Sequence, residues 1–215
     1  MGMWEVPLLL VVIVGSLVVH EYAHAAAALR LGDPTAHRDG RTTLDPRAHL
    51  HPWGSVALPA LTLTTGLGVV GFARPVPVQR ARLRRPKDHV LLVALAGPAA
   101  NVALAVVAGS LLAVLDAPVV PGGWLLPWSS RSPTAAVLLV VGQTNVFLAL
   151  LNLLPVPPLD GAAMVERLMP RRWRRWWPGP VWAGPVVLVL LVLPVPGVMS
   201  RIFGGALRLW ARLWW

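Results

Sequence analysis

The stretch "LVVHEYAHAAAALR", residues 17–30, combines the apolarity of a membrane-spanning helix with two histidines and a glutamate. It closes an apolar run from about Pro7 to Leu29, and a helix needs roughly 20 such residues to cross the hydrocarbon core of a bilayer. Ionisable side chains are costly at that depth and therefore indicate a functional site by default. The stretch predicts a transmembrane helix with a site built into it.

The whole chain has the composition of a polytopic membrane protein. Of its 215 residues, 56% are hydrophobic and 13% charged, and the mean hydropathy is +0.64, which is too apolar for an ordinary soluble domain. A signal peptide is not expected, because the amino-terminal residues lack a basic n-region. Further apolar runs lie at about 53–72, 90–115, 135–154 and 181–193. Because 90–115 and 135–154 are also long enough to span, we expect an all-α fold with three core transmembrane helices.

The net charge of +10 comes from basic residues that gather between the apolar runs, at 30–47, 74–87 and 167–175. Charges so placed are juxtamembrane rather than nucleic-acid-binding, and the positive-inside rule puts all three segments on the cytoplasmic side of the plasma membrane. The run at 53–72, which contains a proline and several glycines, must then leave on the side from which it entered. We expect it to form a re-entrant hairpin, with the ends of the first and fourth runs on the same, cytoplasmic, face.

His20, Glu21 and His24 form the H-E-x-x-H arrangement, in which two histidines bind zinc and the glutamate acts as general base. Residues four apart lie about 40° from one another around a helix, so both imidazoles point the same way. The chain has no cysteine, so any metal must be held by histidine, aspartate or glutamate. The alternative is a chance pattern of histidines hydrogen-bonded between helices, which the cost of burying ionisable groups in a membrane disfavours.

A catalytic zinc usually takes three protein ligands and leaves its fourth position open. The candidates for the third ligand are Asp160, Glu166 and the other histidines. Asp160 directly follows the fourth apolar run in "LLNLLPVPPLDGAAMVERL", and the expected topology puts it on the same face as the histidine pair. The alternative role of Asp160 is an N-cap of a short helix, but the prolines upstream break the chain at membrane depth, which favours a ligand.

The two motifs "HEYAH" (20–24) and "NLLPVPPLDG" (152–161) resemble the signature of site-2 proteases, which are intramembrane zinc metalloproteases. The resemblance covers about residues 10–168 and includes "RLGDPTAHRDGRTTLDPRAHLHPWGSVALP", "GFARPVPV" and "ALAGPAANVALA". It implies one Zn²⁺ per chain, single-pass membrane proteins or peptides as substrates, and cleavage in or near their transmembrane segments. It also implies His20, His24 and Asp160 as zinc ligands and Glu21 as the general base.

Asn152 and Asn101 match recurrent polar positions of that family. Either side chain could donate a hydrogen bond to the oxyanion of a tetrahedral intermediate, and the alternative for both is helix-to-helix hydrogen bonding. His49 matches a family histidine and is expected to support or gate the site. His51 stands where the family tends to have aspartate, and we expect it to be a solvated loop histidine.

Two smaller elements are expected around this core. "TAHRDGRTTL" predicts a cytoplasmic β-hairpin with strands at about 35–38 and 41–44, to whose edge an unwound substrate could add as a strand. The carboxy-terminal "SRIFGGALRLWARLWW" predicts an interfacial amphipathic helix. We therefore divide the chain into a catalytic core, 1–168, and carboxy-terminal membrane or interfacial helices, 169–215.

Two other functions are compatible with intramembrane histidines and carboxylates. A zinc-binding membrane transporter would need no general base at Glu21. A catalytically inactive relative that binds membrane proteins would not need the full set of His20, Glu21, His24 and Asp160. The oligomeric state is not indicated by the sequence.

Overall fold

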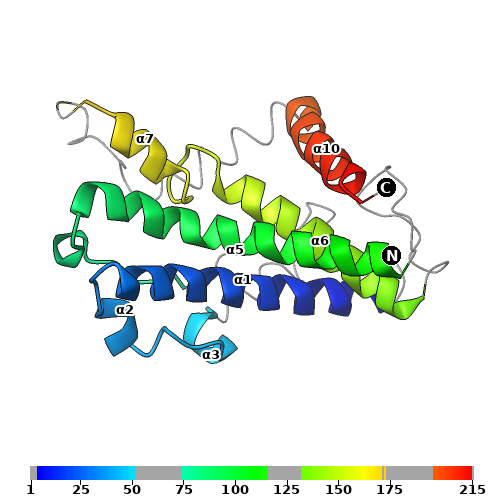
Figure 1. Cartoon of the computed structure of the whole chain (residues 1–215), viewed down its shortest axis with the longest axis horizontal. Coiled ribbons are helices and arrows are strands. Elements are labelled where there is room, and N and C mark those ends of the chain that lie inside the picture. Colours follow the sequence, from blue (N-terminus) through cyan, green and yellow to red (C-terminus); the bar gives the residue numbers. More distant parts are fainter. Residues whose placement is uncertain (1–3, 52–73, 116–131, 171, 173–195, 215) are drawn as a thin grey trace. The chain divides into compact units, whose positions relative to one another are not determined.

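The computed structural model describes residues 4–51, 74–115, 132–170, 172 and 196–214, and in these ranges it contains helices and connecting segments but no β-strand (Figure 1). Three of the described helices are long and apolar enough to cross a membrane: α1 (Glu5–Arg30), α5 (Pro86–Val114) and α6 (Pro133–Asn152). They confirm the first, third and fourth predicted spans. The runs at 53–72 and 181–193, and with them the re-entrant hairpin, lie outside the described residues.

The chain divides into two compact units, Met1–Ala100 and Asn101–Trp215, and α5 contributes its first half to one and its second half to the other. Each unit is described by itself. The predicted division of the chain at residue 168 stays a prediction.

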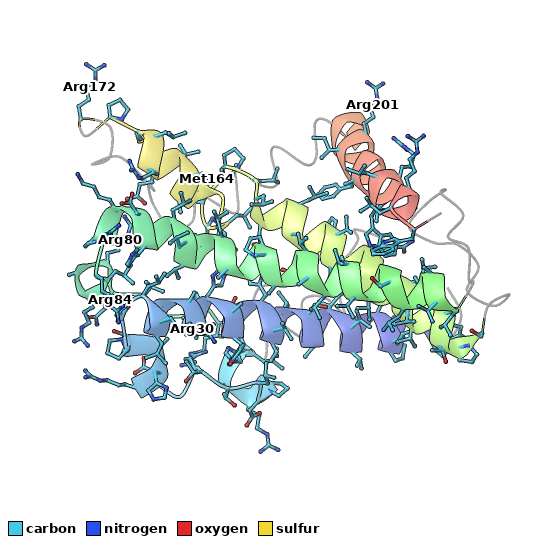
Figure 2. All side chains as sticks on the ribbon, in the orientation of Figure 1. Arg30, Arg80, Arg84, Met164, Arg172 and Arg201 are labelled. Carbon is cyan, nitrogen blue, oxygen red and sulfur yellow. The ribbon has the colours of Figure 1, made fainter. Side chains whose placement is uncertain are left out.

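The first unit is built on α1. Two single-turn helices, α2 (Thr35–Arg38) and α3 (Pro46–His49), pack against it (Figure 1). A small apolar cluster joins the end of α1 to α5 and to the segment just before it, through Ala28, Leu83 and Val93. Figure 2 shows Arg30, Arg80 and Arg84 at the carboxyl end of α1, where the Arg84 amide donates to the Leu31 carbonyl over 3.0 Å. The short 3₁₀ helix η2 (Arg80–Arg82) lies in the same connection.

The predicted β-hairpin at 35–44 is wrong, because its first half is the helix α2 and its second half pairs with no strand among the described residues. The Asp33 carboxylate accepts hydrogen bonds from the Thr35 amide, over 3.0 Å, and from the Thr35 hydroxyl, which starts a helical turn. Gly40, at a φ of +67°, ends it. The amide of Arg41 donates to the carbonyl of residue 36 over 2.8 Å, which is the Schellman pattern of a helix end.

Two long-range hydrogen bonds fasten the chain on either side of residues 52–73. The Arg74 amide donates to the His49 carbonyl over 2.8 Å, and the Gln79 amide donates to Asp33 Oδ2 over 2.6 Å. Burial by itself raises the pKa of Asp33, but the hydrogen bonds from Thr35 and Gln79 outweigh it and lower the pKa below its usual range. Asp33 is therefore ionised, and its hydrogen bonds join the segment after α1 to the segment before α5.

The second unit contains α6, the short helix α7 (Ala162–Leu168) and α10 (Pro196–Arg212), which packs against α6 (Figure 1). Trp210 is the centre of its core: the indole is 5% exposed and donates to the Ala105 carbonyl of α5 over 2.9 Å. A helix in the carboxy-terminal stretch is thus confirmed, and its interfacial position stays a prediction. Trp210, however, is buried by protein rather than directed at lipid headgroups.

Candidate metal centre

The candidate metal centre starts from two histidines on one face of α1. His20 and His24 are 4% and 7% exposed, and their Nε2 atoms lie 3.0 Å apart. The rings meet edge to face, with centroids 4.6 Å apart. The spacing of four residues in a helix produces this convergence, as the sequence predicted.

A carbonyl of α5 orients His24. His24 Nδ1 lies 2.7 Å from the Val93 carbonyl oxygen, so the proton sits on Nδ1 and the Nε2 lone pair is directed at His20. Two imidazole nitrogens bound to one tetrahedral zinc at 2.0–2.1 Å stand about 3.3 Å apart. The observed separation of 3.0 Å is close to that value, so this donor pair fits zinc.

Gly97 of α5 forms the wall opposite the two imidazoles. A Cβ atom at Gly97 would lie 2.4 Å from His24 Nε2 and 2.6 Å from His20 Nε2. Those distances are far shorter than any van der Waals contact, so the missing side chain provides the room around the two nitrogens. The histidine pair of α1 therefore packs directly against Gly97.

Glu21 follows His20 on α1 and is half-buried. Its neighbours His20 and His24 are both buried, so Glu21 is the more accessible member of the motif. This suits a group that must exchange protons with water.

Asp160 is held by a loop that closes on the end of α6. The amide of Gly161 donates to the carbonyl of Asn152 over 2.7 Å. A Cβ at Gly161 would lie 2.3 Å and 2.4 Å from the carbonyl oxygens of Leu153 and Leu154, so only glycine fits there. The N-cap position of α7 is Gly161 and not Asp160, which weakens the alternative role of the aspartate.

The chain is similar to known proteins over most of its length. The profile of Peptidase family M50 matches residues 128–193. YwhC of Bacillus subtilis, whose name assigns it to the zinc metalloproteases, is 37% identical over 190 residues, which are 88% of this chain and 82% of that protein. The chain belongs to peptidase family M50. This is the site-2 protease family, so the resemblance read from the two motifs is confirmed.

More distant relatives carry zinc metalloprotease names as well. Rip2 of Mycolicibacterium smegmatis is 34% identical over 83% of this chain and 64% of its own length. Rip3 of Mycobacterium tuberculosis is 28% identical over 91% of this chain, which covers 39% of that protein. No solved structure matches this chain.

The two candidate oxyanion donors of the M50 chain both make hydrogen bonds within the second unit. Asn101 is fully buried, and its Nδ2 donates to Asn145 Oδ1 over 2.7 Å. Asn152 Nδ2 donates over 2.9 Å to the Leu148 carbonyl in its own helix. The bond from Asn101 of α5 to Asn145 of α6 is the helix-to-helix hydrogen bond that the sequence left open as the alternative role of Asn101. The oxyanion role of both asparagines stays a prediction.

Sequence reasoning missed Asn145, which is fully buried in α6 and receives the bond from Asn101. Its own Nδ2 donates to the carbonyl of Val141 over 2.8 Å. An asparagine inside the apolar run 135–154 was the available signal, since a polar group at that depth needs a partner.

His49 ends α3 and is fully buried, with Nε2 lying 2.8 Å from the Thr43 carbonyl oxygen, to which it donates. This bond, with that of the Arg41 guanidinium to the Ala48 carbonyl, holds α3 in place. A supporting role for His49 stays a prediction. His51 is exposed, as expected.

Proposed function

We infer that this M50 chain is an intramembrane zinc metalloendopeptidase, which hydrolyses peptide bonds in or near the transmembrane segments of single-pass membrane proteins. One observation carries the proposal: two imidazole Nε2 atoms converge to 3.0 Å inside a helix apolar enough to span a bilayer, with Glu21 between them in sequence. Membership of family M50 supports it.

Asp160 is proposed as the third ligand of a single zinc. Two histidines and a carboxylate are a donor set typical of catalytic zinc. The loop closed by Gly161 holds Asp160 at the end of an apolar helix, where a carboxylate would otherwise be costly. Glu166, the other carboxylate considered, lies within α7 and beyond that closed loop.

The chemistry divides between the metal and the chain. Zinc, when bound, would supply a Lewis acid that polarises the scissile carbonyl and would lower the pKa of the attacking water. Glu21 accepts a proton from the attacking water on its carboxylate oxygen and delivers that proton to the nitrogen of the leaving amine. The Val93 carbonyl keeps the His24 proton on Nδ1, so that Nε2 stays available as a ligand. Asn101 and Asn152 are proposed to donate to the developing oxyanion.

The basic segments of the chain indicate where the protein lies in the cell. The basic segments 30–47 and 74–87 follow α1 and precede α5, and the positive-inside rule assigns them to the cytoplasm. His20 and His24 lie in the last three turns of α1, on the same side. We therefore propose a multi-pass plasma membrane protein whose active site lies near the cytoplasmic face.

The test is cleavage of a panel of single-pass substrates by the detergent-purified protein, with zinc counted in every sample. Glu21→Gln should retain zinc and cut at least about 100-fold more slowly, because a general base contributes that much or more. Asp160→Ala should lose zinc, and the matched control Glu166→Gln should keep both zinc and activity. Undiminished cleavage by Glu21→Gln would exclude the assigned base. Zinc binding by the wild type without cleavage of any substrate would favour the transporter.

A further inference from the structure

The helix α10 has three parallel stripes of different chemistry. Positions i, i+7 and i+11 of an α-helix fall within about 40° of one another. One stripe is basic, the next aliphatic, and the third, opposite the basic one, aromatic. The basic stripe is Arg201, Arg208 and Arg212; the aliphatic stripe is Ile202 and Leu209, continued by Leu213 in the turn that follows the helix; the aromatic stripe is Phe203 and Trp210, continued by Trp214 in the same turn.

The aromatic stripe is the one that packs on protein. The Phe203 and Phe147 rings lie 4.7 Å apart, and the Trp210 indole fills the notch at Gly142, where a Cβ would lie 2.3 Å from the ring. A Cβ at Gly109 would likewise meet the Trp214 ring, at 2.1 Å. These contacts fix how α10 is rotated, so its other two stripes face away from α5 and α6.

The contacts also fix the depth of α10. Gly142 is the midpoint of α6, a candidate membrane span of 20 residues. Each end of that span is on the order of 15 Å away, at 1.5 Å per residue. Because Trp210 fills the notch at Gly142, Arg208 and Arg212, two residues to either side of it, lie near the middle of this candidate span.

Arginine at that depth is costly unless it is paired. All three arginines of α10 are exposed, and Figure 2 shows Arg201 projecting outward from the helix. No acidic residue occurs in α10, and no hydrogen bond or ion pair joins these guanidinium groups to another side chain of the described residues. Beside them, Leu209 and Leu213 are 64% and 62% exposed. The basic and aliphatic stripes together make one exposed face, which we name the arginine–leucine face.

We propose that the arginine–leucine face docks a transmembrane segment of another protein that carries carboxylates four residues apart. The guanidinium groups of Arg208 and Arg212, also four apart, match such carboxylates in charge and spacing. Pairing α10 with α10 of a second copy would only bring arginines together. Lipid phosphates stand at the ends of the α6 span, too far for either arginine. This proposal does not depend on proteolysis.

The experiment measures energy transfer between the labelled full-length protein and a labelled single-pass peptide in phosphatidylcholine vesicles. The peptide is a leucine-rich helix with two central glutamates four residues apart, or two glutamines at the same positions. All proteins carry Glu21→Gln so that the peptide stays intact. The variants are R208Q/R212Q, the charge-exchanged R208E/R212E, and the matched control R38Q/R47Q, which changes exposed arginines of the first unit.

We expect the glutamate peptide to associate about tenfold more tightly than the glutamine peptide, since each buried polar pair between membrane helices contributes a modest free energy. R208Q/R212Q should lose that preference and R38Q/R47Q should keep it. R208E/R212E should instead prefer a peptide with two lysines. Such a reversal would show direct pairing even if R208Q/R212Q is poorly folded. Equal association of the wild type with both peptides overturns the proposal. So does a glutamate preference that survives in R208Q/R212Q, or an arginine-dependent preference for phosphatidylglycerol vesicles in place of the peptide.

Discussion

Replacing Gly97 by alanine should strongly reduce zinc binding while leaving the protein folded. The new Cβ would lie 2.4 Å from His24 Nε2 and 2.5 Å from His20 Cε1. Ordinary van der Waals contact begins at about 3.5 Å, so α1 and α5 must separate, or the rings must move, by about 1 Å. Metal ligands tolerate only about 0.2 Å.

The magnitudes of the two effects differ enough to separate them. Overpacking costs about 1–3 kcal/mol, and the helix regains roughly 0.5–1 kcal/mol from alanine, so the free energy of unfolding should fall by less than about 2.5 kcal/mol. A displacement of about 1 Å at the reacting centre, in contrast, lowers catalysis about 100-fold. We therefore expect a folded protein with little zinc and about 100-fold slower cleavage.

The assay is the zinc content and substrate cleavage of the purified variant, together with its thermal unfolding. The matched control is Gly15→Ala on α1, where a Cβ would meet nothing within 4 Å. That variant should keep zinc and become slightly more stable, because alanine is the better helix former. The argument fails if Gly97→Ala binds zinc and cleaves like the wild type, or if both variants lose zinc equally.

Three further predictions concern other parts of the chain. Gly161→Ala should open the loop that holds the proposed third ligand, since its Cβ would collide with carbonyl oxygens at the end of α6, and zinc counting should show a loss without unfolding. Asp33→Asn should lower the free energy of unfolding by about 2 kcal/mol at neutral pH. The lowered pKa of Asp33 means that its stabilisation is present above the usual carboxyl pKa and lost as pH falls through the lowered value, so unfolding followed against pH should show the two proteins converging in acid. Gly142→Ala should cost about 1–3 kcal/mol by displacing Trp210, whereas Gly205→Ala, whose nearest contact would be 3.9 Å, should be tolerated in the same thermal assay.

The elements that hydrophobicity decides were predictable from the sequence. The apolar runs became α1, α5 and α6, and the prolines after α6 ended it where expected. The convergence of His20 and His24 was predictable too, because residues four apart in a helix lie on the same face. In each of these cases a local pattern determines the structure.

The elements that depend on tertiary partners or on side-chain capping were not predicted. The segment 35–44 resembled a hairpin because Asp39 and Gly40 suit a tight turn, but the Asp33 carboxylate starts a helix there and Gly40 ends it. The tryptophans of α10 suggested a lipid interface, since an indole suits lipid and protein equally well. Gly142, which receives Trp210, lies far away in sequence, and no local pattern around Gly142 indicates which side chain will pack on it.

The pinning of the chain at residues 49 and 74 has a practical consequence for protein engineering. The Arg74 amide on the His49 carbonyl, reinforced by the Gln79 amide on Asp33, fixes the two points where the intervening segment leaves and rejoins the first unit. A change in the length of the chain between Arg74 and Gln79 would break one of the two pins. An epitope or a fluorescent reporter should therefore be kept out of residues 33–49 and 74–79 if His20, His24 and Gly97 are to keep their positions.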